Sequence, residues 1–278
     1  MASGATREQW RKTGLAAMAN YIDAGSIVAG AVSLPIWAKQ FGFGDDFVSL
    51  LGAMSSNAIS AGIGALIGGR ICDLYGRKKI YQYDLLLYAF GALWIVFAQA
   101  PWMLLFGYFI VGLTVGADVP ASWTLITETA PAKIRGRLAG LAQVLWYVGA
   151  IAPLVLGIAL LGLGEWMPRI LFAQLVVVAL ITWGLRQGMV ESELWAKAQQ
   201  QGKGAAGAFR ELFRRRHVRA LSFLILMYGV WNLVAGTYGF FFPTSSRPSA
   251  TPASARTTRC RRSGSSRPRS RWGWCTCR

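Results

Sequence analysis

Three carboxylates lie inside or beside long apolar runs of this chain: Asp23, Asp84 and Asp118. A charged carboxylate at the centre of a membrane helix costs about 2.5–3.5 kcal/mol on insertion scales, so each needs a partner, water or a proton. Because burial disfavours the charged form, such an acid can bind and release a proton near neutral pH. These residues therefore indicate proton exchange, with Asp23 and Asp118 as the candidate proton-coupling groups.

The three acids differ in their positions along the apolar runs. Asp23 lies about ten residues into the first run, and Asp118 lies deep in the fourth. Asp84 is near the start of the third run, where pairing with an arginine at the membrane surface is the expected role. Basic side chains occur only at the ends of the first six runs, so we expect no cation deep in the bundle to neutralise Asp23. The alternative for Asp23 is a carboxylate satisfied by neighbouring hydroxyls without titrating.

The elements that hold these acids are long apolar segments. Of the 278 residues, 54% are hydrophobic and 15% are charged, and the mean hydropathy is +0.39, whereas soluble domains are about 25% charged. Small residues such as Gly64 and Gly68 let membrane helices approach closely. We therefore predict an all-α polytopic membrane helical bundle. Runs long enough to cross about 30 Å of hydrocarbon occur at 14–38, 48–71, 80–99, 102–126, 138–162, 168–185 and 220–242.

The distribution of basic residues predicts how the spans are oriented. Eighteen Lys and Arg residues flank the spans on the side of the N-terminus, and two, Lys39 and Arg169, flank them on the other side. Because cytoplasmic loops carry the excess of basic side chains, we predict a multi-pass protein of the plasma (inner) membrane with a cytoplasmic N-terminus. The net charge of +17 does not indicate a nucleic-acid partner, since the basic residues of the body are not clustered on a solvated domain.

The predicted organisation has four parts. Residues 1–185 form an N-terminal six-helix transmembrane bundle, 186–219 a basic cytoplasmic loop, 220–243 a seventh transmembrane helix, and 244–278 a disordered tail. The loop either lies on an anionic leaflet as a helix or is a solvated linker. The tail holds nine Arg and three of the four Cys, with no Lys, Asp or Glu. We favour a shifted reading frame in GC-rich DNA as its origin, with a genuine disordered tail as the alternative.

Residue types typical of enzymes are scarce in this sequence. The single histidine, His217, lies in an arginine-rich loop, and the sequence contains no phosphate-binding loop and no cluster of metal ligands. We therefore expect no enzymatic activity, no cofactor and no metal.

The most specific motif is a tight basic turn between the second and third spans. It reads Gly-Arg-Ile-Cys-Asp-Leu-Tyr-Gly-Arg-Lys-Lys and occupies residues 69–79. A glycine permits a sharp reversal, an aspartate can bond the amides at a helix end, and basic residues hold the turn in the cytoplasm. The residues assigned to this gating motif are Gly69, Asp73, Gly76, Arg77 and Lys78.

Two further motifs follow spans four and six on the same side. The first consists of Glu128, Pro131, Arg135 and Gly136. Its proline ends the helix, and its glutamate is expected to pair with Arg135 or Arg77. The second is Glu191-Ser192, which follows span six.

Together the three motifs resemble those of the major facilitator superfamily, and the second resembles the sugar-porter signature of that family. The resemblance covers residues 10–243 and implies the N-terminal six-helix half of a twelve-helix fold, plus a seventh span. It also implies proton-coupled symport of a small polar solute, a sugar or cyclitol, by alternating access. Asp23 matches the span-one aspartate of proton-linked sugar porters, whereas Tyr108 stands where such porters have an arginine in span four.

The resemblance also assigns candidate substrate-binding residues. Gln143 stands at the spacing of the sugar-binding glutamine in span five, with aromatic residues one turn on. Amides bond hydroxyl groups and aromatic rings stack on C–H faces, which is the chemistry that a polyhydroxylated ring requires. For the buried asparagines, interhelical hydrogen bonding is the alternative. The full set is Gln143, Trp146, Tyr147, Asn57, Trp231 and Asn232.

Features of the sequence are also consistent with other functions. Within the same superfamily, an organic or aromatic acid could replace the sugar in proton-coupled symport. A non-transporting membrane fragment is an alternative of another class, because the sequence reaches only half of the twelve helices. A seven-helix receptor or retinal protein is disfavoured, since the charge distribution places the N-terminus inside and span seven contains no lysine.

Overall fold

Helices joined by short turns make up the structure, a computed structural model in which residues 6–54, 59–188, 218–227, 229–230 and 234 are described. The long elements are α1 (Arg7–Phe41), α2 (Asp45–Ala53), α3 (Ile59–Tyr75), α4 (Arg77–Val96), α5 (Pro101–Thr129), α6 (Arg135–Ala159) and α7 (Trp166–Arg186). A short 3₁₀ helix, η1 (Leu161–Leu163), precedes α7. Further along the chain, Val218–Met227 is a shorter apolar helix. These elements belong to one unit, Met1–Ser246, and the second unit, Arg247–Arg278, lies outside the described residues.

The all-helical fold class predicted from the sequence is confirmed, and the helices differ in how well they match the predicted spans. By length and composition, α1, α5, α6 and α7 can each cross a membrane. Shorter apolar helical stretches, Ile59–Cys72 and Tyr83–Val96, lie within α3 and α4. The predicted second span falls on two helices, α2 and α3, with residues 55–58 between them outside the described part.

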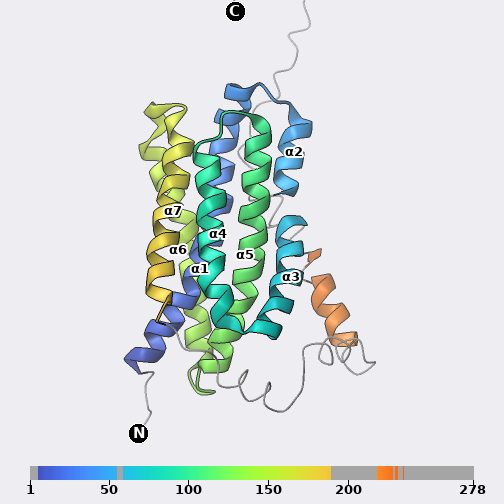
Figure 1. The fold of residues 1–278 in the computed structure, drawn as a ribbon, viewed down its shortest axis with the longest axis vertical. Coiled ribbons are helices and arrows are strands. Elements are labelled where there is room, and N and C mark those ends of the chain that lie inside the picture. The colour runs from blue at the N-terminus through green and yellow to red at the C-terminus, as the bar shows by residue number, and fades with distance from the viewer. Residues whose placement is uncertain (1–5, 55–58, 189–217, 228, 231–233, 235–278) are drawn as a thin grey trace, which may run out of the picture. The chain divides into compact units, whose positions relative to one another are not determined.

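Successive long helices run up and down through the bundle (Figure 1). The N-terminal end of α1, the turns α3–α4 and α5–α6, and the last residue of α7 all lie at one end, hereafter called the N-side end. Helix α5 packs against α1, α3 and α4, while α1 also packs against α6 and α7, and α4 against α7. Helices α1 and α5 are therefore central, and their side chains are the ones that neighbouring helices can contact.

The turns at the N-side end follow from two local sequence signals. Gly76 separates α3 from α4 with φ = 93°, a conformation that favours glycine. Its N–H donates to the carbonyl of Cys72 at 3.0 Å and so closes the end of α3. Helix α5 ends at Thr129, two residues before Pro131, which cannot donate a backbone hydrogen bond to continue the helix. Both reversals agree with the sequence prediction.

Small residues bring the central helices into backbone contact. A Cβ on Gly64 of α3 would collide with the backbone of Leu113 on α5, and a Cβ on Gly116 of α5 would collide with Ala61. Gly149 of α6 lies in the same way against the backbone of Tyr21 on α1. This close packing, which membrane helices achieve with small residues, sets the distances at which polar side chains on α1, α5 and α6 meet.

Candidate functional site

A predicted proton-coupling residue and a predicted substrate-binding residue are in direct contact. Asp23 is near the midpoint of α1 and is 8% exposed. The indole Nε1–H of Trp146, near the midpoint of α6, donates a hydrogen bond of 3.2 Å to Asp23 Oδ2. The Trp146 ring also packs edge to face on Tyr147, with ring centroids 5.4 Å apart. The carboxylate is thus buried and oriented by a neutral donor.

Two further hydrogen-bonded pairs, which are not among the predicted site residues, each involve a residue of α1 within one turn of Asp23. The hydroxyls of Ser26 on α1 and Tyr88 on α4 are 2.7 Å apart. On the neighbouring side of α1, Gln174 Nε2 of α7 donates to the Tyr21 hydroxyl at 2.8 Å. All of these side chains stand within about two helical turns of Asp23 or near the middle of their own helices. Together with Asp23 and Trp146 they form a group hereafter called the midplane cluster.

Gln174 in the midplane cluster and Asn20 next to it on α1 each have an amide atom without a hydrogen-bond partner among the described residues. Asn20, one turn before Asp23 on α1, is buried, and its Nδ2 has no hydrogen-bond partner among the described residues. The same holds for the Oε1 atom of Gln174 within the described part of the chain. Most buried polar groups in proteins are satisfied, so a donor and an acceptor left over in a hydroxyl-rich cluster are available for a polar ligand.

The other predicted substrate-binding residues either form no hydrogen bond with this cluster among the described contacts or fall outside the described chain. Gln143 and Tyr147 are exposed on α6, and Tyr147 is 57% exposed. The structure therefore brings Trp146 to Asp23 but does not bring Gln143 or Tyr147 to a polar partner on another described helix. Asn57, Trp231 and Asn232 fall outside the described residues.

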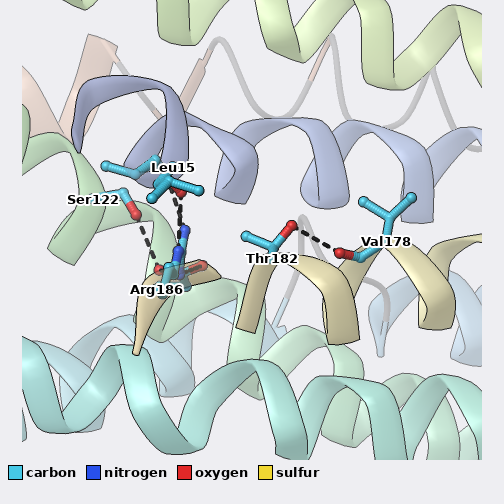
Figure 2. Close-up of polar contacts among 7 residues, drawn as sticks. Leu15, Ser122, Val178, Thr182 and Arg186 are labelled. Atoms are coloured by element: carbon cyan, nitrogen blue, oxygen red, sulfur yellow. Dashed lines mark hydrogen bonds and ion pairs between the residues drawn. The ribbon is translucent and has the colours of Figure 1, made fainter. Parts of the chain in front are cut away.

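Asp118, the second predicted proton-coupling residue, is bound in a buried ion pair. It is 3% exposed, and both of its oxygens accept from Arg186 Nη1, at 3.0 and 2.9 Å. Ser122, one turn further on α5, donates to Asp118 Oδ1 at 3.0 Å. The same guanidinium donates to the backbone carbonyls of Leu15 and Ala16 on α1, at 2.9 and 3.1 Å. Figure 2 shows this arrangement at the end of α7, where Thr182 bonds the Val178 carbonyl one turn away.

The position of Arg186 corrects an expectation drawn from the sequence. The sequence places residue 186 at the start of a cytoplasmic loop, outside the sixth span. In the structure Arg186 is the last residue of α7 and is 2% exposed. Helix α7 continues one residue further than predicted, and the long side chain turns back into the bundle because Asp118 and the carbonyls of α1 satisfy its charge there. A permanent positive partner accordingly accompanies Asp118.

Tyr108, which replaces the arginine expected from the sugar-porter pattern, has a packing role in the part of the fold that is described. It is 1% exposed on α5. Its ring meets Trp37 of α1 and Phe172 of α7 edge to face, with centroid distances of 6.1 and 5.9 Å. These aromatic contacts belong to the apolar core, so an arginine here would place a charge among hydrophobic rings.

The sequence motifs gather at the N-side end. Gly69 is on α3 and Gly76 forms the following turn, while the side chains of Asp73, Arg77 and Lys78 lie outside what the structure describes. In the α5–α6 turn, Arg135 Nη2 donates to the Ala130 carbonyl at 3.4 Å. The other members of this turn are the half-buried Glu128 and the exposed Pro131 and Gly136. The predicted pairing of Glu128 with a basic residue stays a prediction, and Glu191 is outside the described residues.

Comparison with known proteins agrees with this arrangement. The model of the Major Facilitator Superfamily matches residues 13–250. The minor myo-inositol transporter IolF of Bacillus subtilis (strain 168) is 44% identical to the chain over 241 residues, which cover 84% of the chain and 55% of that relative. The niacin transporter NiaP of Acinetobacter baylyi is 36% identical over 97 residues, 34% of the chain and 22% of the relative.

A solved structure gives the same fold. The proton:xylose symporter XylE bound to 6-bromo-6-deoxy-D-glucose superposes with a TM-score of 0.63 and 19% sequence identity, over 77% of this chain and 52% of the symporter. At this identity the likeness establishes the fold alone. The chain spans about half the length of these two relatives, 55% and 52%.

Proposed function

The chain belongs to the Major Facilitator Superfamily, and from this membership we propose that it forms the N-terminal part of a secondary transporter for a small polar solute. The family consists of membrane transporters rather than enzymes, and the chain is a multi-pass membrane protein. The proposed solute is a sugar or a cyclitol. Alternating access would carry it across the membrane in symport with protons.

The midplane cluster is the observation that carries this proposal. Transporters of this architecture bind substrate near the bilayer midplane, between their repeats. Here a buried acid, an indole, two phenols, a serine and an amide form three hydrogen-bonded pairs near the midpoints of four helices. Hydroxyl and amide groups bond the hydroxyls of a cyclitol, and an indole offers an apolar face. The name of the inositol transporter from B. subtilis supports the same solute class.

Asp23 is the proposed proton carrier of this site. Its carboxylate receives a hydrogen bond from the neutral Trp146 indole, so that contact does not balance the negative charge. Binding of a proton would neutralise the carboxylate, and binding or release of that proton would change the hydrogen bond to Trp146 on α6, which lines the proposed substrate site. Binding of the solute and of the proton would thereby be coupled.

Uptake into proteoliposomes tests the coupling. Full-length transporter carrying Asp23→Asn is expected to lose inositol accumulation driven by an inwardly directed proton gradient, while retaining exchange of labelled for unlabelled inositol. Asp45→Asn, which changes an exposed acid at the start of α2, serves as the matched control and should accumulate inositol normally. Gradient-driven accumulation that survives Asp23→Asn would reject Asp23 as the coupling residue.

An aromatic acid is the second candidate solute. The similarity to a niacin transporter favours it, since that relative's name specifies a pyridine carboxylate. Quenching of tryptophan fluorescence on addition of inositol, xylose or niacin to the purified transporter separates the two classes. Saturable quenching by a polyol that is lost in Trp146→Phe supports the sugar or cyclitol site, whereas saturation only with niacin would replace it.

We also propose that the N-side end faces the cytoplasm of a plasma (inner) membrane. The support is the excess of basic residues at that end. A cysteine introduced at Ala132, in the α5–α6 turn, should react with an impermeant maleimide only in opened cells, whereas one at Gly162, in η1, should react in intact cells. The native cysteines are first replaced by serine, and the reverse labelling pattern would invert the orientation.

A further inference from the structure

Asp84 is a buried acid whose carboxylate has no hydrogen bond and no ion pair among the described residues. It lies on α4 and is 8% exposed. Helix α4 packs against α5, which carries Asp118, and against α7, which carries Arg186. The charges of those two residues act on Asp84, and the three residues are hereafter called the Asp84 group. The sequence had suggested an arginine at the membrane surface as the partner of Asp84. Among the described residues, the arginine whose charge acts on Asp84 is Arg186, which donates hydrogen bonds to Asp118 and to two carbonyls of α1.

The charges of this group do not balance. Arg186 gives two hydrogen bonds to Asp118 and one each to the carbonyls of Leu15 and Ala16. Its single positive charge is therefore matched by Asp118, and ionised Asp84 would add a second negative charge in the same buried region. An uncompensated charge away from water is strongly unfavourable. A proton is the smallest ligand that removes it.

We propose that Asp84 is a proton-binding site, and that its protonation keeps the Arg186–Asp118 ion pair intact. The bound proton comes from water, remains on one Asp84 oxygen and leaves the cluster with one acid and one base in their charged forms. The proposal concerns the folded chain itself and holds whether or not Asp23 couples a solute to protons.

A groove connects Asp84 to the surface of the bundle. It has a volume of about 660 Å³ and lies between α3 and α4 over α5. Asp84 is on its wall, together with Thr114 and the aromatic residues Tyr75 and Tyr83, both of which are more than half exposed. Those two tyrosines stand near the α3–α4 turn at the N-side end. The rest of the lining is apolar, so the carboxyl group lies away from bulk water, and the polar side chains at that end mark the proposed entry for proton exchange.

Among the described groups around Asp84, Arg186 is the cation, and it is already paired with Asp118. A proton is therefore what would neutralise Asp84. The charges that act on Asp84 are those of Asp118 on α5 and Arg186 on α7, and Tyr75 on α3 and Tyr83 on α4 line the same groove. Loss of the proton would make Asp84 compete with Asp118 for Arg186. Since Arg186 also holds α1 through two carbonyls, the competition would loosen the junction of α1, α4, α5 and α7.

Infrared difference spectroscopy of the chain in lipid nanodiscs tests the proposal. Spectra recorded between neutral and alkaline pH report the C=O stretch of carboxyl groups that are still protonated at neutral pH, since exposed carboxyls are already ionised there. The measurements use Asp23→Asn as the background, which removes the other candidate. One titrating carboxyl band is expected in this background, and Asp84→Asn should abolish it. Gel filtration and circular dichroism check that each variant is folded.

Two conservative variants assign the band even if Asp84→Asn fails to fold. Asp84→Glu should move the band to the frequency of a glutamic acid, whereas Asp118→Glu should leave its frequency unchanged. The proposal is overturned if no carboxyl band titrates in the background, if the band persists in folded Asp84→Asn, or if it moves in Asp118→Glu instead.

Discussion

Replacing Arg186 by glutamine should weaken the bundle more than any change at an exposed basic residue. The glutamine keeps polarity and part of the length of the side chain but removes the charge. Asp118, which is 3% exposed, would lose both hydrogen bonds from the guanidinium. The carbonyls of Leu15 and Ala16 would lose their donor as well.

The expected loss of unfolding free energy in Arg186→Gln is set by the Asp118 carboxylate, which stays buried without its partner. Breaking a buried ion pair by removing one partner costs about 3–5 kcal/mol, mainly because the other charge is left uncompensated. We therefore expect Arg186→Gln to lower the free energy of unfolding by about 3–5 kcal/mol. Combining it with Asp118→Asn removes the stranded charge, so the double variant should be more stable than Arg186→Gln alone.

Equilibrium unfolding in mixed micelles of increasing SDS fraction, followed by tryptophan fluorescence, measures these differences. Arg169→Gln is the matched control, because it changes the same residue type at the other end of the same helix. There the guanidinium lies 5.2 Å from the Trp166 ring centroid, a contact worth about 0.5–1 kcal/mol at exposed sites. A loss at Arg186 no larger than at Arg169, or a double variant less stable than Arg186→Gln, would refute the reasoning.

Two further substitutions test the packing and the midplane cluster. Gly64→Ala should destabilise the chain by about 1–3 kcal/mol, because the added methyl group collides with the α5 backbone. Gly62→Ala is the control and should not destabilise it, since a methyl group at this position meets open space. Equal effects of the two substitutions in SDS unfolding would contradict the contact between α3 and α5. Tyr88→Phe removes the hydrogen bond to Ser26 and should lower the free energy of unfolding by about 1 kcal/mol. Tyr83→Phe, at an exposed position, is the control. Equal unfolding free energies for these two variants would show that the Ser26–Tyr88 hydrogen bond does not stabilise the fold.

The sequence predicts the helices well because their signals are local. Apolar runs of membrane length, a glycine at the α3–α4 turn and a proline after α5 each act within a few residues. The predicted second span, 48–71, begins within α2 and ends within α3, and residues 55–58 between these helices lie outside the described part of the chain.

The site depends on contacts between distant residues, which the sequence indicates only in part. The sequence indicates Asp23 as an acid within an apolar run and Trp146 as an aromatic residue one turn after Gln143. It does not indicate that they touch. Their contact, between residues 123 positions apart, results from the packing of α6 on α1. Tyr88 and Gln174 were missed because a single tyrosine or glutamine in an apolar run is equally consistent with core packing. Arg186 was counted with the surface arginines, since a basic residue at a predicted span end ordinarily marks the membrane boundary.

Helix α1 links the two acidic regions of the molecule. The carbonyls of Leu15 and Ala16 hold Arg186, and Asp23 follows Ala16 by seven residues, a rise of about 10 Å along the helix. A shift of α1 against α6 would change the Trp146–Asp23 contact, and the same shift would move the carbonyls that orient Arg186. We therefore expect the charge states of the midplane cluster and of the Asp84 group to influence one another through the position of this helix. Such coupling requires only that α1 has two positions and that the charge state of each site changes the equilibrium between them.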